Sequence, residues 1–187
     1  MSSIDLVILG IVLEQPQSAY DIQKDVEYHH LSRWTKISVP SIYKKVLQLK
    51  EKGYLQSESI KGSKSADKTI YEITDAGKKY FTQLMENYAD KQVSFLFDFN
   101  VVIANLNKID KAQALALVDK LRESIVASAQ MSDAYAKEYS TIPLVGRTIF
   151  EQQKLLYLSL LQWLNQFERE FELDGGYDYE KQVDTFV

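Results

Sequence analysis

The chain has 187 residues, of which 45% are hydrophobic, so it can form one domain or a small domain with a helical extension. It contains no cysteine, which excludes disulfides and thiolate metal sites, and its only histidines, His29 and His30, are adjacent, so a metal cluster would have to be mostly carboxylate. The net charge of −4 argues by itself against nucleic-acid binding.

The first two predicted elements are helices that meet at a proline. Residues 4–14 are almost entirely apolar, and Pro16 ends the helix that they form. This run is too short to span a membrane and predicts a buried helix, which together with the lack of cysteine favours a cytoplasmic location. Ser18 stands three residues before Asp21, the spacing of a capping box, and predicts the start of a second helix.

A third helix is predicted to begin between Ser38 and Ser41, because Pro40 can occupy a first helical turn without losing a hydrogen bond. Gly53 is its predicted end. Its apolar residues recur at helical spacing and predict its buried face: Ile42, Val46 and Leu49.

The pattern then changes from helix to strand. Residues 54–60 and 69–74 predict two short strands, joined by a polar, lysine-rich hairpin loop over 61–68. Thr74 is the predicted N-cap of the next helix. Three helices, a strand, a basic loop and a strand are the order of a winged helix-turn-helix, although amphipathic helices beside a hairpin occur in many folds.

Beyond this hairpin the chain shows only helical patterns, so the predicted fold is mainly α with a small β-hairpin wing. We expect a winged-helix domain over 1–88, a helical domain over 89–173 and a mobile tail over 174–187. Three helices are predicted in the second domain, over 90–107, 110–139 and 147–173.

Positive charge is concentrated in the winged-helix region. Residues 1–32 and 80–187 carry net charges of −4 and −6, whereas residues 33–79 carry +6, from Arg33 and ten lysines against five carboxylates. Because phosphate binding depends on a local basic patch, this segment predicts DNA binding in spite of the acidic chain.

Three stretches resemble the PadR family of bacterial transcriptional regulators: LVILGIVLEQPQSAYDIQKDV, WTKISVPSIYKKVLQLKEKGYL and KTIYEITDAGKKYFTQL. They occur in the family's order and spacing over about the first 85 residues. Ala19 stands where the family often has glycine, and Lys44 where proline often follows the tyrosine. The layout of the second half is similar to the larger subgroup with a C-terminal three-helix dimerisation region, which includes phenolic-acid-responsive repressors and AphA-like virulence activators.

Two groups of residues are candidates for DNA contact. The third helix offers Ser41, Tyr43, Lys44, Lys45 and Gln48, and the wing offers Lys61, Gly62, Lys64 and Lys68. The lysines would neutralise phosphates, while the serine, tyrosine and glutamine could touch base edges or backbone. The alternatives are an ordinary solvated helix face and a solubilising loop.

The last helix carries the candidate dimerisation residues, Leu156, Leu160, Trp163, Leu164 and Phe167. Its apolar arc is wide enough to contact both its own domain and a second subunit, and the resemblance implies a two-fold dimer that binds a pseudo-palindromic operator. Ordinary core packing within one chain is the alternative.

Aromatic residues could line an effector pocket, and the candidates are Arg33, Trp34, Phe95, Phe99 and Trp163. The resemblance implies a phenolic acid, whose carboxylate Arg33 or Arg147 would bind. Plain core packing is the alternative for each aromatic residue.

These patterns favour a homodimeric repressor that a small aromatic effector releases from double-stranded DNA. The alternative is a winged-helix module for protein–protein interaction. No nucleophile elbow, phosphate-binding glycine loop or dinucleotide fingerprint is present, so we predict no enzyme, no catalytic residue, no cofactor, no metal site and no membrane partner.

Overall fold

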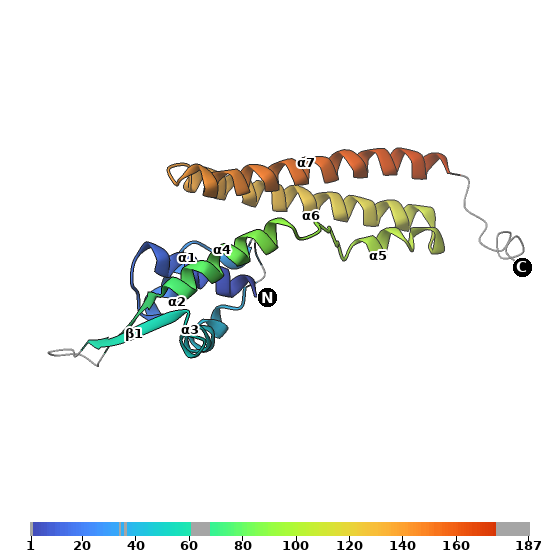
Figure 1. Cartoon of the computed structure of the whole chain (residues 1–187). Helices are drawn as coiled ribbons and strands as arrows, with labels where there is room; N and C mark the ends of the chain where they lie inside the picture. The colour runs from blue at the N-terminus through green and yellow to red at the C-terminus, as the bar shows by residue number, and fades with distance from the viewer. Residues whose placement is uncertain (1, 34, 36, 61–67, 175–187) are drawn as a thin grey trace, which may run out of the picture. The chain divides into compact units, whose positions relative to one another are not determined.

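The computed structural model describes residues 2–33, 35, 37–60 and 68–174, and the chain divides into two compact units, Met1–Ser94 and Phe95–Val187 (Figure 1). The described residues are mainly helical with one antiparallel hairpin, which confirms the predicted fold class. The predicted boundary at residue 88 falls near the end of a helix of the first unit. None of the helices in these ranges has a stretch long and apolar enough to cross a membrane.

The first unit has the order of a winged helix-turn-helix. Its elements are α1 (Ser3–Glu14), α2 (Ala19–Tyr28), two 3₁₀ turns (Leu31–Arg33 and Val39–Ser41), α3 (Ile42–Glu51), β1 (Leu55–Ile60), β2 (Lys68–Ile73) and α4 (Asp75–Ala89). One apolar core joins the helices to the hairpin, and its fully buried members include Ile8 of α1, Ile22 of α2, Leu49 of α3 and Leu84 of α4. This core positions α3 and the wing relative to each other.

The ends of α2 and α3 form as the sequence predicts. At the start of α2 the backbone N–H of Asp21 donates to Ser18 Oγ at 3.2 Å, and the Ser18 N–H donates to the Asp21 carboxylate, which completes the capping box. At the end of α3, Gly53 has φ +76°, and the N–H groups of Gly53 and Tyr54 donate to the carbonyls of Lys50 and Leu49. This left-handed turn sends the chain directly into β1.

The turn between α1 and α2 pairs with β2 along the edge that does not face β1. β1 and β2 pair from Leu55 with Ile73 to Ile60 with Lys68. Gln17 forms a bridge with Tyr71 of β2, in which each backbone N–H donates to the other residue's carbonyl, at 3.1 and 2.8 Å. The strand β2 is therefore hydrogen-bonded on both of its edges.

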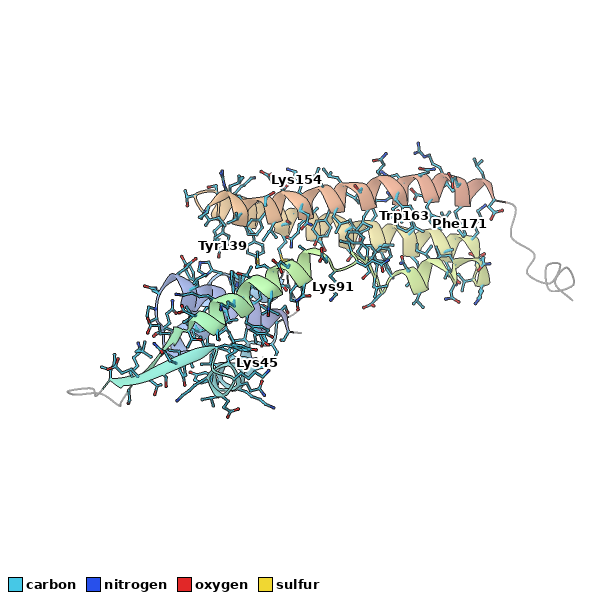
Figure 2. All side chains as sticks on the ribbon, viewed as in Figure 1. Lys45, Lys91, Tyr139, Lys154, Trp163 and Phe171 are labelled. Carbon is cyan, nitrogen blue, oxygen red and sulfur yellow. The ribbon has the colours of Figure 1, made fainter. Side chains whose placement is uncertain are left out.

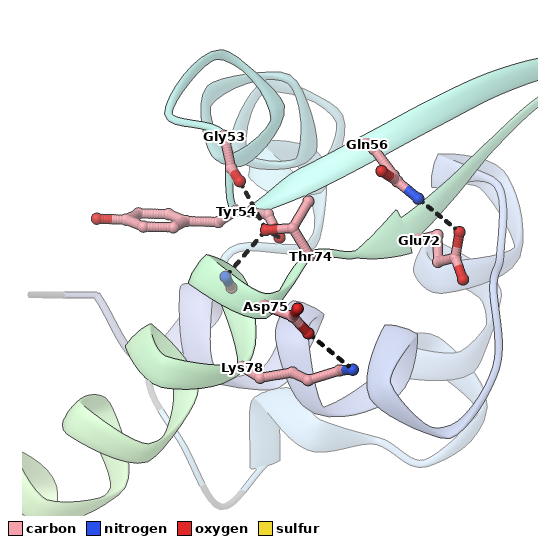
Figure 3. A network of polar contacts seen from close by, with 8 residues as sticks. Gly53, Tyr54, Gln56, Glu72, Thr74, Asp75 and Lys78 are labelled. Atoms are coloured by element: carbon pink, nitrogen blue, oxygen red, sulfur yellow. Dashed lines mark hydrogen bonds and ion pairs between the residues drawn. The ribbon is translucent and has the colours of Figure 1, made fainter.

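Thr74 ties the end of the hairpin to the start of α4 (Figure 3). Its Oγ1 accepts a hydrogen bond from the Gly77 N–H at 3.0 Å and donates to the Gly53 carbonyl at 2.7 Å. Gly77 lies so close to the start of β1 that a Cβ there would collide with the Tyr54 carbonyl oxygen. The predicted N-cap at Thr74 is confirmed, and the glycine three residues later is required by close packing.

The second unit is built on two long helices, α6 (Lys111–Glu138) and α7 (Leu144–Leu173), which lie side by side (Figure 1). Their shared core contains Leu106, Ala114, Val118, Ile125 and Leu164. Arg122 of α6 reinforces it by donating to Asn165 and Glu168 of α7.

The prediction of a helix over 90–107 is wrong. Helical structure in this range is limited to α5 (Asn100–Ile103) and a 3₁₀ turn beginning at Leu106. Residues 92–97 have no regular structure, and Phe95, Phe97 and Phe99 stack in turn, with ring centroids 6.4 and 5.1 Å apart. Residues two apart would point to nearly opposite sides of a helix, so these alternating aromatic side chains favour a non-helical backbone.

Candidate nucleic-acid interface

The helix α3 has one face in the core and one in solvent. Ile42, Val46 and Leu49 are fully buried against the other helices of the first unit. Tyr43 and Lys44 lie on the opposite, exposed face, where they were predicted. Three further residues of α3 share this face and were not predicted: Leu47, Lys50 and Glu51. Counting one helical turn forward from Tyr43 and Lys44 would have found Leu47.

Three of the five candidates on the third helix are half-buried: Ser41, Lys45 and Gln48. The Ser41 hydroxyl donates to the Ser38 carbonyl at 2.6 Å, just before α3 begins. Lys45, labelled in Figure 2, has its ammonium nitrogen 3.2 Å from Oδ1 of Asp5 in α1. The Asp5 side chain is only 7% exposed, so this lysine compensates a buried carboxylate.

An ion pair anchors the wing where its second strand leaves the loop. Lys68 opens β2, and its ammonium lies 2.7 Å from Oδ2 of Asp21 in the first turn of α2. The hydrogen bond from Lys68, followed by that from the Ser18 hydroxyl, lowers the pKa of Asp21 below its ordinary value. The other predicted wing residues, Lys61, Gly62 and Lys64, lie outside the described residues.

The candidate dimerisation residues on α7 are divided between two environments. Leu164 is fully buried against α6, and Leu160 and Phe167 pack on the same core, while Leu156 is half-buried. A fully buried side chain has no surface left for another subunit. Trp163 is partly exposed. In the middle of this helix Leu155 and Leu158 are more exposed and were not predicted, and Leu144, Val145 and Leu173 are exposed at its ends.

The candidate effector residues of the second unit belong to one aromatic row. Phe99 packs at a tilt against Trp163, with 6.0 Å between ring centroids, and Trp163 stacks on Phe167, also at 6.0 Å. Phe171, labelled with Trp163 in Figure 2, continues the row. Phe95 joins this row through Phe97. Arg33 ends a 3₁₀ turn of the first unit, and its side chain and Trp34 lie outside the described part of the chain.

Comparison with known families agrees with this geometry. The transcriptional regulator PadR-like family matches residues 8–83, which run from α1 to α4 and include α3 and both wing strands. Among curated proteins, none matches the chain.

Three solved structures share the fold over 91% of this chain. PadR of Bacillus subtilis in complex with operator DNA is 15% identical, with a TM-score of 0.75 over 99% of its own chain. The same protein with p-coumaric acid is 14% identical, with a TM-score of 0.74 over 96% of its chain. The Vibrio cholerae virulence activator AphA is 15% identical, with a TM-score of 0.63 over 98% of its chain. At these identities the likeness shows a shared fold.

Proposed function

We propose that this chain, whose residues 8–83 match the PadR-like family of transcriptional regulators, is a DNA-binding regulator rather than an enzyme. In this proposal it is a cytoplasmic homodimeric repressor that a small aromatic molecule releases from its operator. The observation that carries the proposal is the exposed face of α3 next to an anchored wing, both within the segment of net charge +6. A helix with one free face can enter the major groove, while the wing contacts the backbone beside it.

The proposed dimer uses the second unit. Leu155 and Leu158 of α7 are each more than half exposed, and Trp163 adds a partly exposed indole on the same helix. Exposed apolar residues that cluster on one element favour association with another protein surface. A two-fold dimer would present two copies of α3 to the two halves of a pseudo-palindromic operator.

The proposed effector is a planar aromatic acid. The aromatic row of Phe95, Phe97, Phe99 and Trp163 supplies ring faces for stacking, and Bacillus subtilis PadR, which shares the fold, has been solved with p-coumaric acid. Seating such a ligand would shift the population toward a state that no longer fits both half-sites.

DNA binding is tested by fluorescence anisotropy with a duplex taken from the region upstream of the chain's own gene, over a series of salt concentrations. We expect salt-dependent binding that Lys44→Glu weakens roughly ten-fold or more at low salt, because an exposed cation becomes an anion at the phosphates. Lys120→Glu makes the same charge change at an exposed position of α6 and should bind like the parent. Equal affinities for the two variants would contradict the assignment of α3.

The same titration tests the effector and the alternative function. Adding p-coumarate should release the duplex and quench the tryptophan fluorescence of the parent; the absence of both effects at millimolar ligand would contradict this effector. The absence of salt-dependent binding to any duplex would favour the second candidate, a winged-helix module for protein–protein interaction.

A further inference from the structure

The exposed face of α3 carries an apolar pair. Tyr43 is 45% exposed and Leu47 is 50% exposed, and the two residues are one helical turn apart. Neither belongs to the core of the first unit, which α3 reaches through Ile42, Val46 and Leu49. An apolar pair on a face that would contact DNA, outside the core, needs an explanation other than folding.

The side chains that usually read purines are scarce on this helix. α3 contains no arginine and no asparagine, and its single amide residue, Gln48, is half-buried. Arginine is the commonest reader of guanine, and asparagine or glutamine reads adenine. Lys44 and Lys50 flank the apolar pair and are exposed, and Glu51, one turn after Leu47, is exposed as well, so two cations and one anion surround the pair.

We propose that Tyr43 and Leu47 contact the 5-methyl groups of thymines, and that the operator half-site carries thymine where these two residues meet it. The inference rests on the proposed function, in which α3 lies in the major groove. Thymine is the only base that presents a methyl group there, and apolar side chains recognise it by burying that methyl. The two lysines beside the pair exceed the single carboxylate of Glu51, so this face is net positive and matches the phosphates that border the groove, which favours DNA over an apolar protein partner.

The test uses deoxyuridine, which pairs like thymine but lacks the methyl group. A duplex is first selected from a random pool by its binding to the full chain, and each thymine in it is then replaced singly by deoxyuridine. For the parent, replacement at a contacted position should weaken binding about four-fold, the value of one buried methyl group. Replacement at the other thymines should have no effect.

Two variants separate reading by Leu47 from a general loss of affinity. Leu47→Ala should bind the thymine and deoxyuridine duplexes equally at one of the sensitive positions, because the side chain that contacts the methyl is shortened. Leu13→Ala removes an exposed leucine from α1 and should keep the parent's four-fold response. Thermal melting followed by circular dichroism checks that both variants fold, which we expect because alanine favours helices.

The outcomes are distinct. If the parent binds the selected duplex and its fully deoxyuridine-substituted form equally, or if Leu47→Ala keeps the parent's response at every position, the inference is wrong and the proposed function stands. If no duplex is enriched from the pool, the proposed function fails, and the inference fails with it.

Discussion

The ammonium nitrogen of Lys45 lies 3.2 Å from Oδ1 of Asp5, so an ion pair joins α3 to α1 beneath the face proposed to contact DNA. Asp5 is buried among the apolar residues of α1, whereas the Lys45 side chain is 28% exposed. Lys44, the preceding residue, is exposed on the face proposed to contact DNA. Adjacent lysines therefore have different surroundings, and their substitutions should have different effects.

Lys45→Met should lower the free energy of unfolding by about 2–3 kcal/mol, because it leaves a buried carboxylate without its cation. This loss is smaller than for a fully buried ion pair, since water reaches the lysine. Lys44→Met should change it by less than about 0.5 kcal/mol, as expected for a surface substitution. Urea unfolding measures both. Adding Asp5→Asn to Lys45→Met should recover part of the loss, and a double variant less stable than Lys45→Met would contradict the pairing.

DNA binding should show the opposite order for the same two lysines. Loss of a phosphate contact lowers the slope of log affinity against log salt by about one unit, which we expect for Lys44→Met. Lys45→Met should leave the slope unchanged because its ammonium is bound to Asp5. A reduced slope for Lys45→Met would show that this ammonium also reaches a phosphate.

The contact between Asp21 and Lys68 makes stability depend on pH. Because the pKa of Asp21 is lowered in the folded chain, its ionised form stabilises the fold above the unfolded pKa, near 3.8, and this contribution is lost as the pH falls through the folded value. Asp21→Asn should therefore cost about 0.5–1 kcal/mol at pH 7. The difference from the parent should shrink below pH 4.

Asp75→Asn is the matched control, since Asp75 occupies the first turn of α4 and its ion pair with Lys78 is exposed. Urea unfolding at pH 7 and pH 3 compares the two variants. A gap between Asp21→Asn and the parent that stays constant down to pH 2 would rule out the proposed linkage.

Gly77 and Gly10 provide a pair of identical substitutions with opposite expected signs. A Cβ at Gly77 would collide with the Tyr54 carbonyl and come within 2.8 Å of Ile73 Cγ1, so Gly77→Ala should destabilise by about 2–3 kcal/mol. At Gly10 in α1 the nearest atom, Phe81 Cε2, is 3.5 Å away, so Gly10→Ala should stabilise by about 0.5–1 kcal/mol through helix propensity. Thermal unfolding compares the melting temperatures of the two variants. Equal melting temperatures would refute the close approach at Gly77.

The features that the sequence predicts correctly depend on neighbours along the chain. Three such features are the capping box at Ser18, the left-handed Gly53 and the cap at Thr74. Each depends on hydrogen bonds between residues at most a few positions apart in the sequence. Lys45 could not be separated from Lys44 in this way, because its carboxylate partner is on another helix, far back in the sequence. The missed break in 90–107 had a local signal, the alternation of Phe95, Phe97 and Phe99, which helical periodicity cannot produce.

The apolar residues of α7 show a second limit of prediction. Helical spacing identifies an apolar arc, but only packing against α6 decides which of its side chains are covered. Leu164 is buried against α6, whereas Leu155 and Leu158 lie on the outer surface.

This division predicts that assembly and stability can be changed separately. Leu155→Glu with Leu158→Glu should convert the proposed dimer to a monomer, because two charges would be buried at the interface, while each chain keeps its helical content. Leu164→Ala should cost about 2–5 kcal/mol of folding stability through a cavity between α6 and α7. Sedimentation velocity measures assembly and circular dichroism measures unfolding. A double glutamate variant that still sediments as a dimer would place the interface elsewhere on the chain.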